Sequence, residues 1–153
     1  MNALDIIFRD KVTVFSRYGQ DESLVWIPTV ITDVHFVDDK AAVIGSYGES
    51  TQDNAMLHVF YKLKGSDIYV GNKKYYPPKE FERLSSHTNA VTFQYGDKFG
   101  FVYGGLWTDT QNVYDMDYKH GFYDYMNKNY DRVYAITGVS QRNLIPHFEI
   151  TAR

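Results

Sequence analysis

Alternating apolar and polar residues predict that the chain is built mainly of β-strands. In residues 11–17 the order KVTVFSR places Val12 and Val14 on one face of a strand. Residues 24–37 are rich in Val, Ile, Thr and aromatic side chains, which predicts a second strand. Pro28 interrupts this run. Because proline has no N–H to donate to a ladder, we expect an edge or a bend there.

Six further runs of the same kind follow, separated mostly by turns rich in Gly, Asp, Asn and Ser. The predicted strands are residues 41–47, 56–63, 68–70, 90–95, 132–139 and 145–152, with a turn at 140–144. Pro77 and Pro78 open one short helix over 79–84, since a proline in the first turn lacks only an N–H that would be unpaired anyway. Turn signals every 8–12 residues or so predict one mainly β domain over 1–153, a small antiparallel β-barrel or sandwich.

Residues 96–131 do not follow this pattern and predict a long aromatic insertion between two strands. Apolar side chains recur there every four residues, near the helical period, at Tyr114, Tyr118, Phe122, Met126 and Tyr130. This spacing predicts a helix over 108–129, capped by Thr108 or Asp109. A long excursion without a full helix is the alternative, because Gly121 would cost such a helix about 1 kcal/mol.

The insertion also lies in the part of the chain that is richest in aromatic residues. Aromatic residues make up 17% of the 153 residues, and half of them lie between residues 93 and 134. From Trp107 to Tyr130 they alternate with Asp and Lys, and such a mixture is typical of a contact surface. Ordinary core packing is the alternative. The predicted partner-contact residues are Trp107, Tyr114, Tyr118, Phe122, Tyr123 and Tyr125, and residues 48–54 form a predicted second contact.

Charge and cysteine content remove several function classes. The formal net charge is −3, without the basic excess of a typical nucleic-acid binder. The chain has no Cys, which excludes thiolate catalysis, cysteine zinc sites and disulfides. No run of ~18 apolar residues predicts a membrane helix, and the first ten residues lack the pattern of a secretory signal. We therefore expect no membrane association and no cofactor.

The sequence contains few residues in spacings that are typical of a catalytic or metal-binding site. The sequence contains none of the phosphate-binding glycine loops, the G-x-S-x-G elbow or the H-E-x-x-H zinc motif. Asp115, Asp117 and His120 are the most metal-like cluster, but on a helix the two carboxylates would point to different sides. A solvated polar face is the favoured interpretation, and a metal-dependent hydrolase is a minor alternative. His35 and His58 lie in predicted strands, where a position on a sheet face is favoured over a catalytic role. We predict no catalytic residue and no metal site.

Three passages resemble the small minor capsid proteins of phages and prophages of Gram-positive hosts. Residues 12–18, VTVFSRY, with VHF at 34–36, are similar to that family's T-L-F-x-x-Y and G-V-H-W strands. The passage 65–78, GSDIYVGNKKYYPP, and the ending 135–150, AITGVSQRNLIPHFEI, also resemble family patterns, the latter I-x-x-V-x-D-N-R…P-H-W-x-V. The chain departs from the pattern at Ser140-Gln141, where the family tends to Asp-Asn. It also departs at Phe148, where the family has Trp, and residues 96–131 have no counterpart.

This resemblance implies a structural protein of the virion, assembled in the cytoplasm of a bacterial host. Such proteins act at the head-to-tail interface as head-closure (stopper) or connector components. The resemblance further implies a β-barrel in a homo-oligomeric ring that contacts portal or adaptor and tail proteins, with DNA at most passing through the channel. A ring of identical subunits needs two different, complementary patches on each subunit, and the aromatic insertion is a candidate for one. A carbohydrate- or protein-binding module with exposed aromatic side chains is the alternative.

Overall fold

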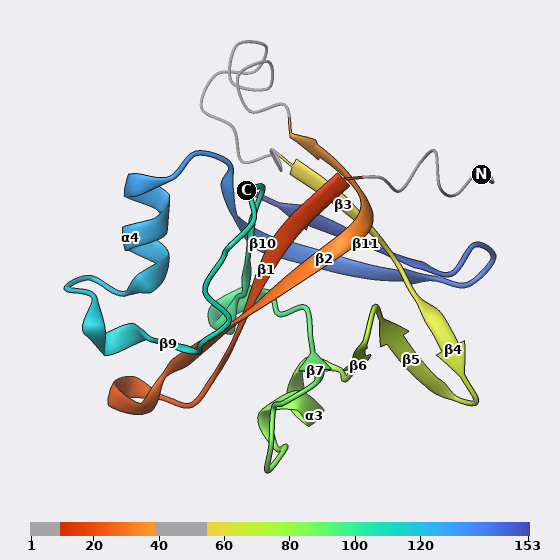
Figure 1. Cartoon of the computed structure of the whole chain (residues 1–153), viewed down its shortest axis with the longest axis horizontal. Coiled ribbons are helices and arrows are strands. Elements are labelled where there is room, and N and C mark those ends of the chain that lie inside the picture. Colours follow the sequence, from red (N-terminus) through yellow and green to blue (C-terminus); the bar gives the residue numbers. More distant parts are fainter. Residues whose placement is uncertain (1–9, 39–54) are drawn as a thin grey trace.

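Six antiparallel strands close into a barrel in the computed structural model, which describes residues 10–38 and 55–153 (Figure 1). In order around the barrel they are β1 (Asp10–Tyr18), β8 (Phe101–Tyr103), β10 (Val133–Arg142), β11 (His147–Ala152), β3 (Ala55–Phe60) and β2 (Val25–Asp38). The long strand β2 closes the barrel, because its residues 25–34 pair with β1 and its residues 34–38 pair with β3. The predicted mainly β barrel is confirmed.

Pro28 lies within β2 without breaking it. It faces Phe15 of β1 on one side. On the other side of β2, β3 pairs only from Val34 onward, and the short strand β9 (Val113–Tyr114) pairs only with Val25 and Trp26. Among the described residues, Pro28 therefore faces no strand on that side, and the prediction of an edge position is confirmed.

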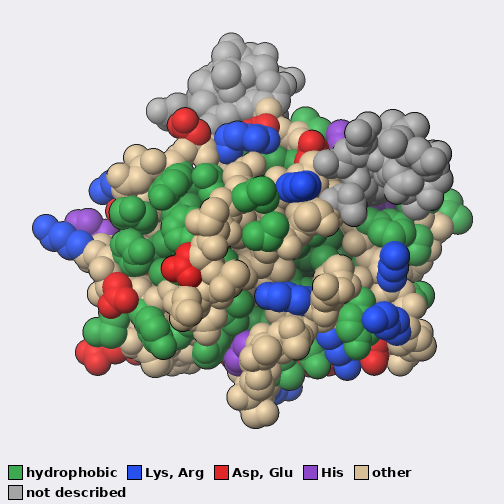
Figure 2. Space-filling model, viewed as in Figure 1, with side chains coloured by type: hydrophobic (Ala, Val, Ile, Leu, Met, Phe, Trp, Pro, Cys, Tyr) green, Lys and Arg blue, Asp and Glu red, His purple; other side chains and the backbone are tan. Residues whose placement is uncertain are grey.

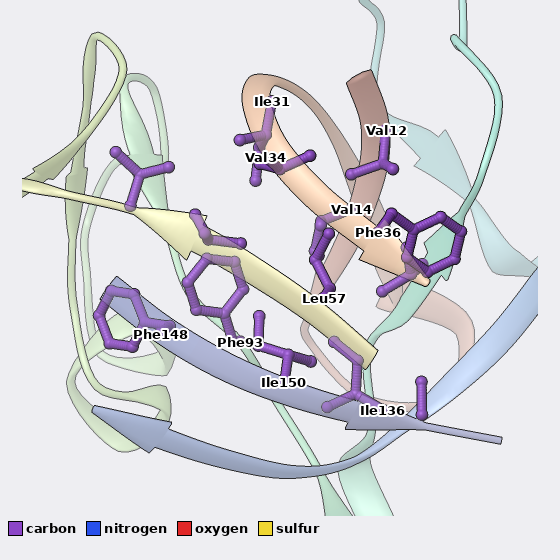
Figure 3. Packing of buried hydrophobic residues seen from close by; sticks show 14 of the residues in the cluster. Val12, Val14, Ile31, Val34, Phe36, Leu57, Phe93, Ile136, Phe148 and Ile150 are labelled. Atoms are coloured by element: carbon purple, nitrogen blue, oxygen red, sulfur yellow. The ribbon is translucent and has the colours of Figure 1, made fainter. Parts of the chain in front are cut away.

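Inward-pointing side chains fill the barrel (Figure 3). Those labelled in the figure are Val12, Val14, Ile31, Val34, Phe36, Leu57, Phe93, Ile136, Phe148 and Ile150. Each such side chain contributes about 1.5–3 kcal/mol by leaving water. The interior is thus a packed core, as expected for a barrel of this size.

A second, four-stranded sheet leaves one end of the barrel. It contains β4 (Lys62–Lys64), β5 (Asp67–Val70), β6 (Lys73–Tyr75) and β7 (Ala90–Val91), with helix α3 (Pro78–Glu82) between β6 and β7. The predicted strand 56–63 breaks at the buried Tyr61, whose N–H donates to the carbonyl of Pro146 instead of to a neighbour in the ladder. The predicted helix 79–84 is present but begins and ends slightly earlier.

Two other predicted strands have different limits. Of residues 90–95 only β7 is a strand, because the side chain of Gln94 replaces the ladder. Its Nε2 donates to the carbonyl of Arg17 at 2.7 Å and its Oε1 accepts from the N–H of Arg17 at 2.8 Å. The strand predicted at 132–139 continues to Arg142 and shortens the turn expected at 140–144. The strand 41–47 and the contact 48–54 lie outside the described residues.

The aromatic insertion needs a larger correction. Its first part contains β8, which is a barrel strand between β1 and β10, so the excursion from the barrel runs from Gly104 to Arg132. The helix predicted over 108–129 is wrong over most of its length, since only α4 (Phe122–Asn129) is α-helical. The rest contains β9 and a 3-10 turn at Asp115–Asp117; further 3-10 turns lie at Asp21–Ser23 and Gly96–Lys98. None of the helices in the described part of the chain has the length and apolarity needed to cross a membrane.

Candidate functional site

The excursion 104–132 leaves and re-enters the barrel at a single neck. The N–H of Gly104 donates to the carbonyl of Arg132 at 2.9 Å, so the two ends of the excursion meet. The guanidinium of Arg132 holds the carboxylate of Asp38 on β2 through two hydrogen bonds of 2.8 and 3.2 Å. The hydroxyl of Tyr134 donates to the same carboxylate at 2.9 Å. The excursion is therefore joined to the barrel by an ion pair and hydrogen bonds as well as by the chain itself.

The electrostatics of this neck follow from its contacts. Partial burial alone would raise the pKa of Asp38, but the hydrogen bonds from Arg132 and Tyr134 outweigh it and lower that pKa. Burial, together with the hydrogen bond to Asp38, raises the pKa of Tyr134 to about 12. At neutral pH the neck therefore carries one carboxylate, one guanidinium and one neutral phenol.

Asp115 fixes the middle of the excursion to the barrel. Its Oδ1 accepts from the indole N–H of Trp26 and from the backbone N–H of Phe122, both at 2.9 Å. The second bond satisfies a donor at the start of α4, which explains why the helix begins there. Gly121 precedes it with φ of +92°, a conformation that favours glycine, and a Cβ there would lie 3.3 Å from Asp115 Oδ1. Neither Thr108 nor Asp109 is the cap of this helix.

Buried aromatic rings form the base of the excursion. Phe122 and Met126, one helical turn apart, pack against Phe15 and Phe101 on the outer face of the barrel. The ring of Phe122 is 0% exposed, so its prediction as a partner-contact residue is wrong. The sequence pattern could not show this, because the apolar surface that covers Phe122 comes from strands about 20 to 110 residues away. The alternative of core packing holds for this residue.

Trp107 belongs to the same base but is only half-buried. Its ring lies 5.7 Å from that of Phe122 and 5.6 Å from that of Phe15. Its backbone N–H donates to the hydroxyl of Thr13 at 3.0 Å, and this hydroxyl donates to the carbonyl of Gly105. Tyr123 is also half-buried, 5.1 Å from Phe101 between ring centres, and its burial raises the pKa of its phenol. Both side chains mainly support the surface above them.

Three tyrosines on top of this base form an exposed tyrosine ridge, Tyr118, Tyr125 and Tyr130. Ring centres are 4.6 Å apart between Tyr118 and Tyr125 and 6.3 Å apart between Tyr125 and Tyr130. Tyr125 is 37% and Tyr130 36% exposed, and Tyr118 is half-buried. Desolvation, followed by the neighbouring phenols, raises the pKa of Tyr118 and of Tyr130, so both stay neutral donors. The structure therefore brings two of the predicted contacts together in one surface.

Further exposed apolar side chains extend this end of the molecule. Tyr114, a predicted contact, is 53% exposed on β9, and Met116 in the following turn is 61% exposed. Met116 and Tyr130 were not among the predicted partner-contact residues. Tyr130 could have been chosen from its position one turn beyond Met126, where α4 ends and its backbone N–H caps the carbonyl of Met126.

The predicted metal-like cluster does not assemble. Asp115 is occupied by Trp26 and Phe122, as described above, and cannot turn toward Asp117 and His120 without giving up those bonds. Among residues 10–38 and 55–153, no three His, Cys, Asp or Glu side chains are grouped so that they could hold a metal ion.

A model of the family of unknown function DUF6751 matches residues 7–153. The chain belongs to DUF6751. The matched range takes in all six barrel strands and the whole excursion. No curated protein and no solved structure matches the chain.

Three histidines of the DUF6751 chain line up on the outer face of the barrel. His35 on β2 pairs directly with His58 on β3, with ring centres 5.7 Å apart, and His147 on β11 lies 5.5 Å from His58. Glu149 contacts His147 at 3.3 Å. The predicted position of His35 and His58 on a sheet face is confirmed. Burial lowers the pKa of His58, and the two neighbouring imidazoles add to this against the opposing effect of Glu149.

A cavity of about 680 Å³ lies apart from the tyrosine ridge. It is bounded by the end of the β1–β2 hairpin, the loop 84–89, and Thr110 and Asn112 of the excursion. Its histidine, His87, is engaged in packing, since its ring stacks on Tyr18 at 3.9 Å and its Nε2 lies 2.7 Å from the carbonyl of Phe81. Lys73 contacts the hydroxyl of Thr29 at 3.0 Å, and burial lowers the pKa of its amine. These contacts describe a polar cleft.

Proposed function

We propose that this DUF6751 chain is a structural protein of a phage particle that acts at the head-to-tail interface. Its mechanism is assembly and involves no catalytic step. Copies form a ring that docks to a portal or adaptor on one side and to tail proteins on the other. DNA at most passes through the channel, and the ring is assembled in the cytoplasm of the bacterial host.

The tyrosine ridge is the observation that carries this proposal. A closed barrel and the anchored base at Asp115 hold the exposed rings in place, so a partner orders few side chains on binding. Tyrosine is enriched where proteins contact one another, because its ring is apolar and its hydroxyl remains hydrated. The resemblance of the barrel strands to minor capsid proteins supports the same function.

Protein analysis of purified particles tests the proposal. We expect mass spectrometry to detect the chain in particles released from the host at a fixed copy number. We also expect that deleting its gene leaves filled heads that are not joined to tails. Absence of the chain from complete particles, or normal particles without it, would contradict the proposal.

A carbohydrate-binding module remains a second candidate, favoured by the same exposed rings, which could stack on sugar faces. The discriminating residue is Tyr125, because Trp107 supports the base and its loss would disturb the fold. Binding to a glycan array that disappears in Tyr125→Ala, in a chain absent from particles, would favour this candidate.

A further inference from the structure

We propose that copies of this chain join head to tail, with the tip of the β10–β11 hairpin of one copy seated on the tyrosine ridge of the next. This inference rests on the proposed assembly function and names the two surfaces that meet. The two ends of the molecule that carry these surfaces differ in shape, apolar character and charge.

The first end is an exposed apolar tip. Leu144 in the turn between β10 and β11 is 99% exposed, and Ile145 beside it is 48% exposed. A fully exposed leucine beside an exposed isoleucine is unfavourable in water unless a partner covers them. Leu144 lies at the end of the turn predicted over 140–144, and the apolar letters LIP after SQRN were the available signal of this tip.

This tip is held rigidly from below. The hydroxyl of the buried Tyr61 lies 3.1 Å from the carbonyl of Arg142 and 3.0 Å from Oδ1 of Asn143. The backbone N–H of Tyr61 donates to the carbonyl of Pro146 at 3.2 Å, so both sides of the turn are tied to the barrel. A prearranged tip loses little conformational entropy on binding, which favours a role as the inserted element.

The second end offers a place of suitable size. A shallow cavity of about 160 Å³ opens at the start of α4, lined by Tyr118 and Tyr125 and also by charged side chains, among them Lys119, Asp124 and Lys128. An apolar cavity of ~150 Å³ accepts a ligand the size of benzene, so one leucine side chain fits this volume.

The charges around the two surfaces are opposite. In the excursion, the charges of Asp124 and Lys128 cancel within one ion pair, and the charge of Arg132 is cancelled by Asp38 in another. Three exposed aspartates then remain against Lys119, namely Asp109, Asp117 and Asp131, since Asp115 is half-buried and already accepts from Trp26 and Phe122. At the other end, the exposed Lys62 and Lys64 flank Leu63, itself 59% exposed. Complementary charges of this kind orient two surfaces before contact.

The two surfaces face in opposite directions. Figure 1 shows α4 and β9 at one end of the long axis, with β4 and the tip of the β10–β11 hairpin at the other. In Figure 2, red and blue side chains both lie toward the first end, and a group of mostly blue ones lies toward the second. One copy cannot join its own two ends, so the tip of one copy must meet the ridge of another. In a two-fold dimer each tip would meet the other copy's ridge, and a double variant that stops at a dimer in the test below would show that arrangement and overturn the head-to-tail chain. Repeated head-to-tail contact covers both and closes into a ring when the rotation permits.

Disulfide trapping tests the contact directly, because the chain contains no native Cys. The double variant Leu144→Cys/Tyr125→Cys is expected to give, under mild oxidation, a ladder of covalent multimers in denaturing electrophoresis. A 1:1 mixture of the two single variants is expected to stop at one dimer, about twice the monomer mass of 17.8 kDa. The control pair Tyr95→Cys/Tyr125→Cys, with Tyr95 55% exposed in a loop, is expected to give neither product above background.

The outcomes separate this inference from the proposed function. Equal cross-linking of the control pair, or a monomeric double variant, would overturn the head-to-tail contact. The chain could then still be found in particles, and the proposed function would stand with different contact surfaces. A ladder from a chain that is absent from particles would instead support the contact and contradict the proposed function.

Discussion

At the scale of single residues, one carboxylate decides where the excursion lies on the barrel. Asp115 accepts hydrogen bonds from the indole of Trp26, which is 2% exposed, and from the first N–H of α4. The sequence pointed to Asp115 as a metal-ligand candidate. Its structural role could not be predicted, because its partner Trp26 is 89 positions away. Residues chosen for their type alone are therefore the least predictable part of this site.

Replacement of Asp115 by alanine is expected to destabilise the protein strongly. The buried indole N–H of Trp26 would lose its acceptor, at a cost of ~1–3 kcal/mol, and α4 would lose its cap, at about 1 kcal/mol. We expect urea denaturation to show a loss of roughly 2–4 kcal/mol in the free energy of unfolding. The control Asp117→Ala, at an exposed position, is expected to change it by less than about 0.5 kcal/mol. Equal effects of the two variants would contradict the anchoring role.

His58 is expected to make the fold sensitive to mild acid. Its pKa in the folded state is lowered, mainly by burial, and its surroundings contain His35, His147 and Glu149. Below the unfolded pKa of ~6.5 the unfolded chain binds a proton that the folded chain resists, so stability falls as the pH decreases.

The measurement is the free energy of unfolding at pH 7.5 and at pH 5.5. His58→Gln is expected to lose less stability between these two pH values than the natural chain does. His120→Gln, which changes an exposed histidine of the excursion, is expected to behave like the natural chain. If both variants keep the full decrease, His58 is not its source.

At the scale of elements, the strands were more predictable than the excursion. Alternation located β1, β2, β10 and β11 because each has a face on the barrel core. The four-residue recurrence wrongly predicted a helix over most of 108–129. Tyr114 lies on β9 and Tyr118 directly follows a 3-10 turn, so neither is helical. The recurrence holds only where Phe122 and Met126 face the barrel from α4. Strand β8 was missed because three residues flanked by glycines carry too little pattern.

Deletion of the excursion is expected to disturb the barrel itself. Without residues 105–131, the outer sides of Phe15, Phe101 and Val133 would be exposed to water, since the excursion is their cover. We expect such a variant to bind a hydrophobic dye and to unfold at lower urea concentration than the natural chain. A soluble variant of unchanged stability would show that the excursion is an independent addition. Point variants on the tyrosine ridge are the cleaner test of assembly.

At the scale of the whole molecule, the difference in charge between its two ends matters more for the choice of partner than its net charge does. A formal charge of −3 suggested little about partners. The folded chain separates that charge, with unpaired aspartates in the excursion and exposed lysines on β4. Composition could indicate neither this separation nor the exposed tip at Leu144, because both depend on which distant segments the topology brings to each end.

Assembly of the natural chain is accordingly expected to weaken with salt and with charge reversal. Light scattering at 0.05 and 0.5 M NaCl is expected to show smaller assemblies at the higher concentration, where screening is effective within about 4–5 Å. Lys62→Glu/Lys64→Glu is expected to reduce assembly at low salt. Lys79→Glu/Arg83→Glu, at two exposed positions beside α3, is the matched control and is expected to assemble normally. Salt-independent assembly would contradict an electrostatic contribution.

The burial of β1 on both faces has a consequence for how the chain folds. Val12 and Val14 are buried only when the barrel interior forms. Thr13 and Phe15, on the other face, are buried only when residues 101–133 pack over them. Strand β1 therefore stays uncovered until distant segments arrive, and its pairing with β8 closes a loop of more than 80 residues. Proteins dominated by such distant pairings fold in about milliseconds to seconds. During that time the apolar run from Val12 to Phe15 is exposed, so production in a host at high level is expected to depend on chaperones.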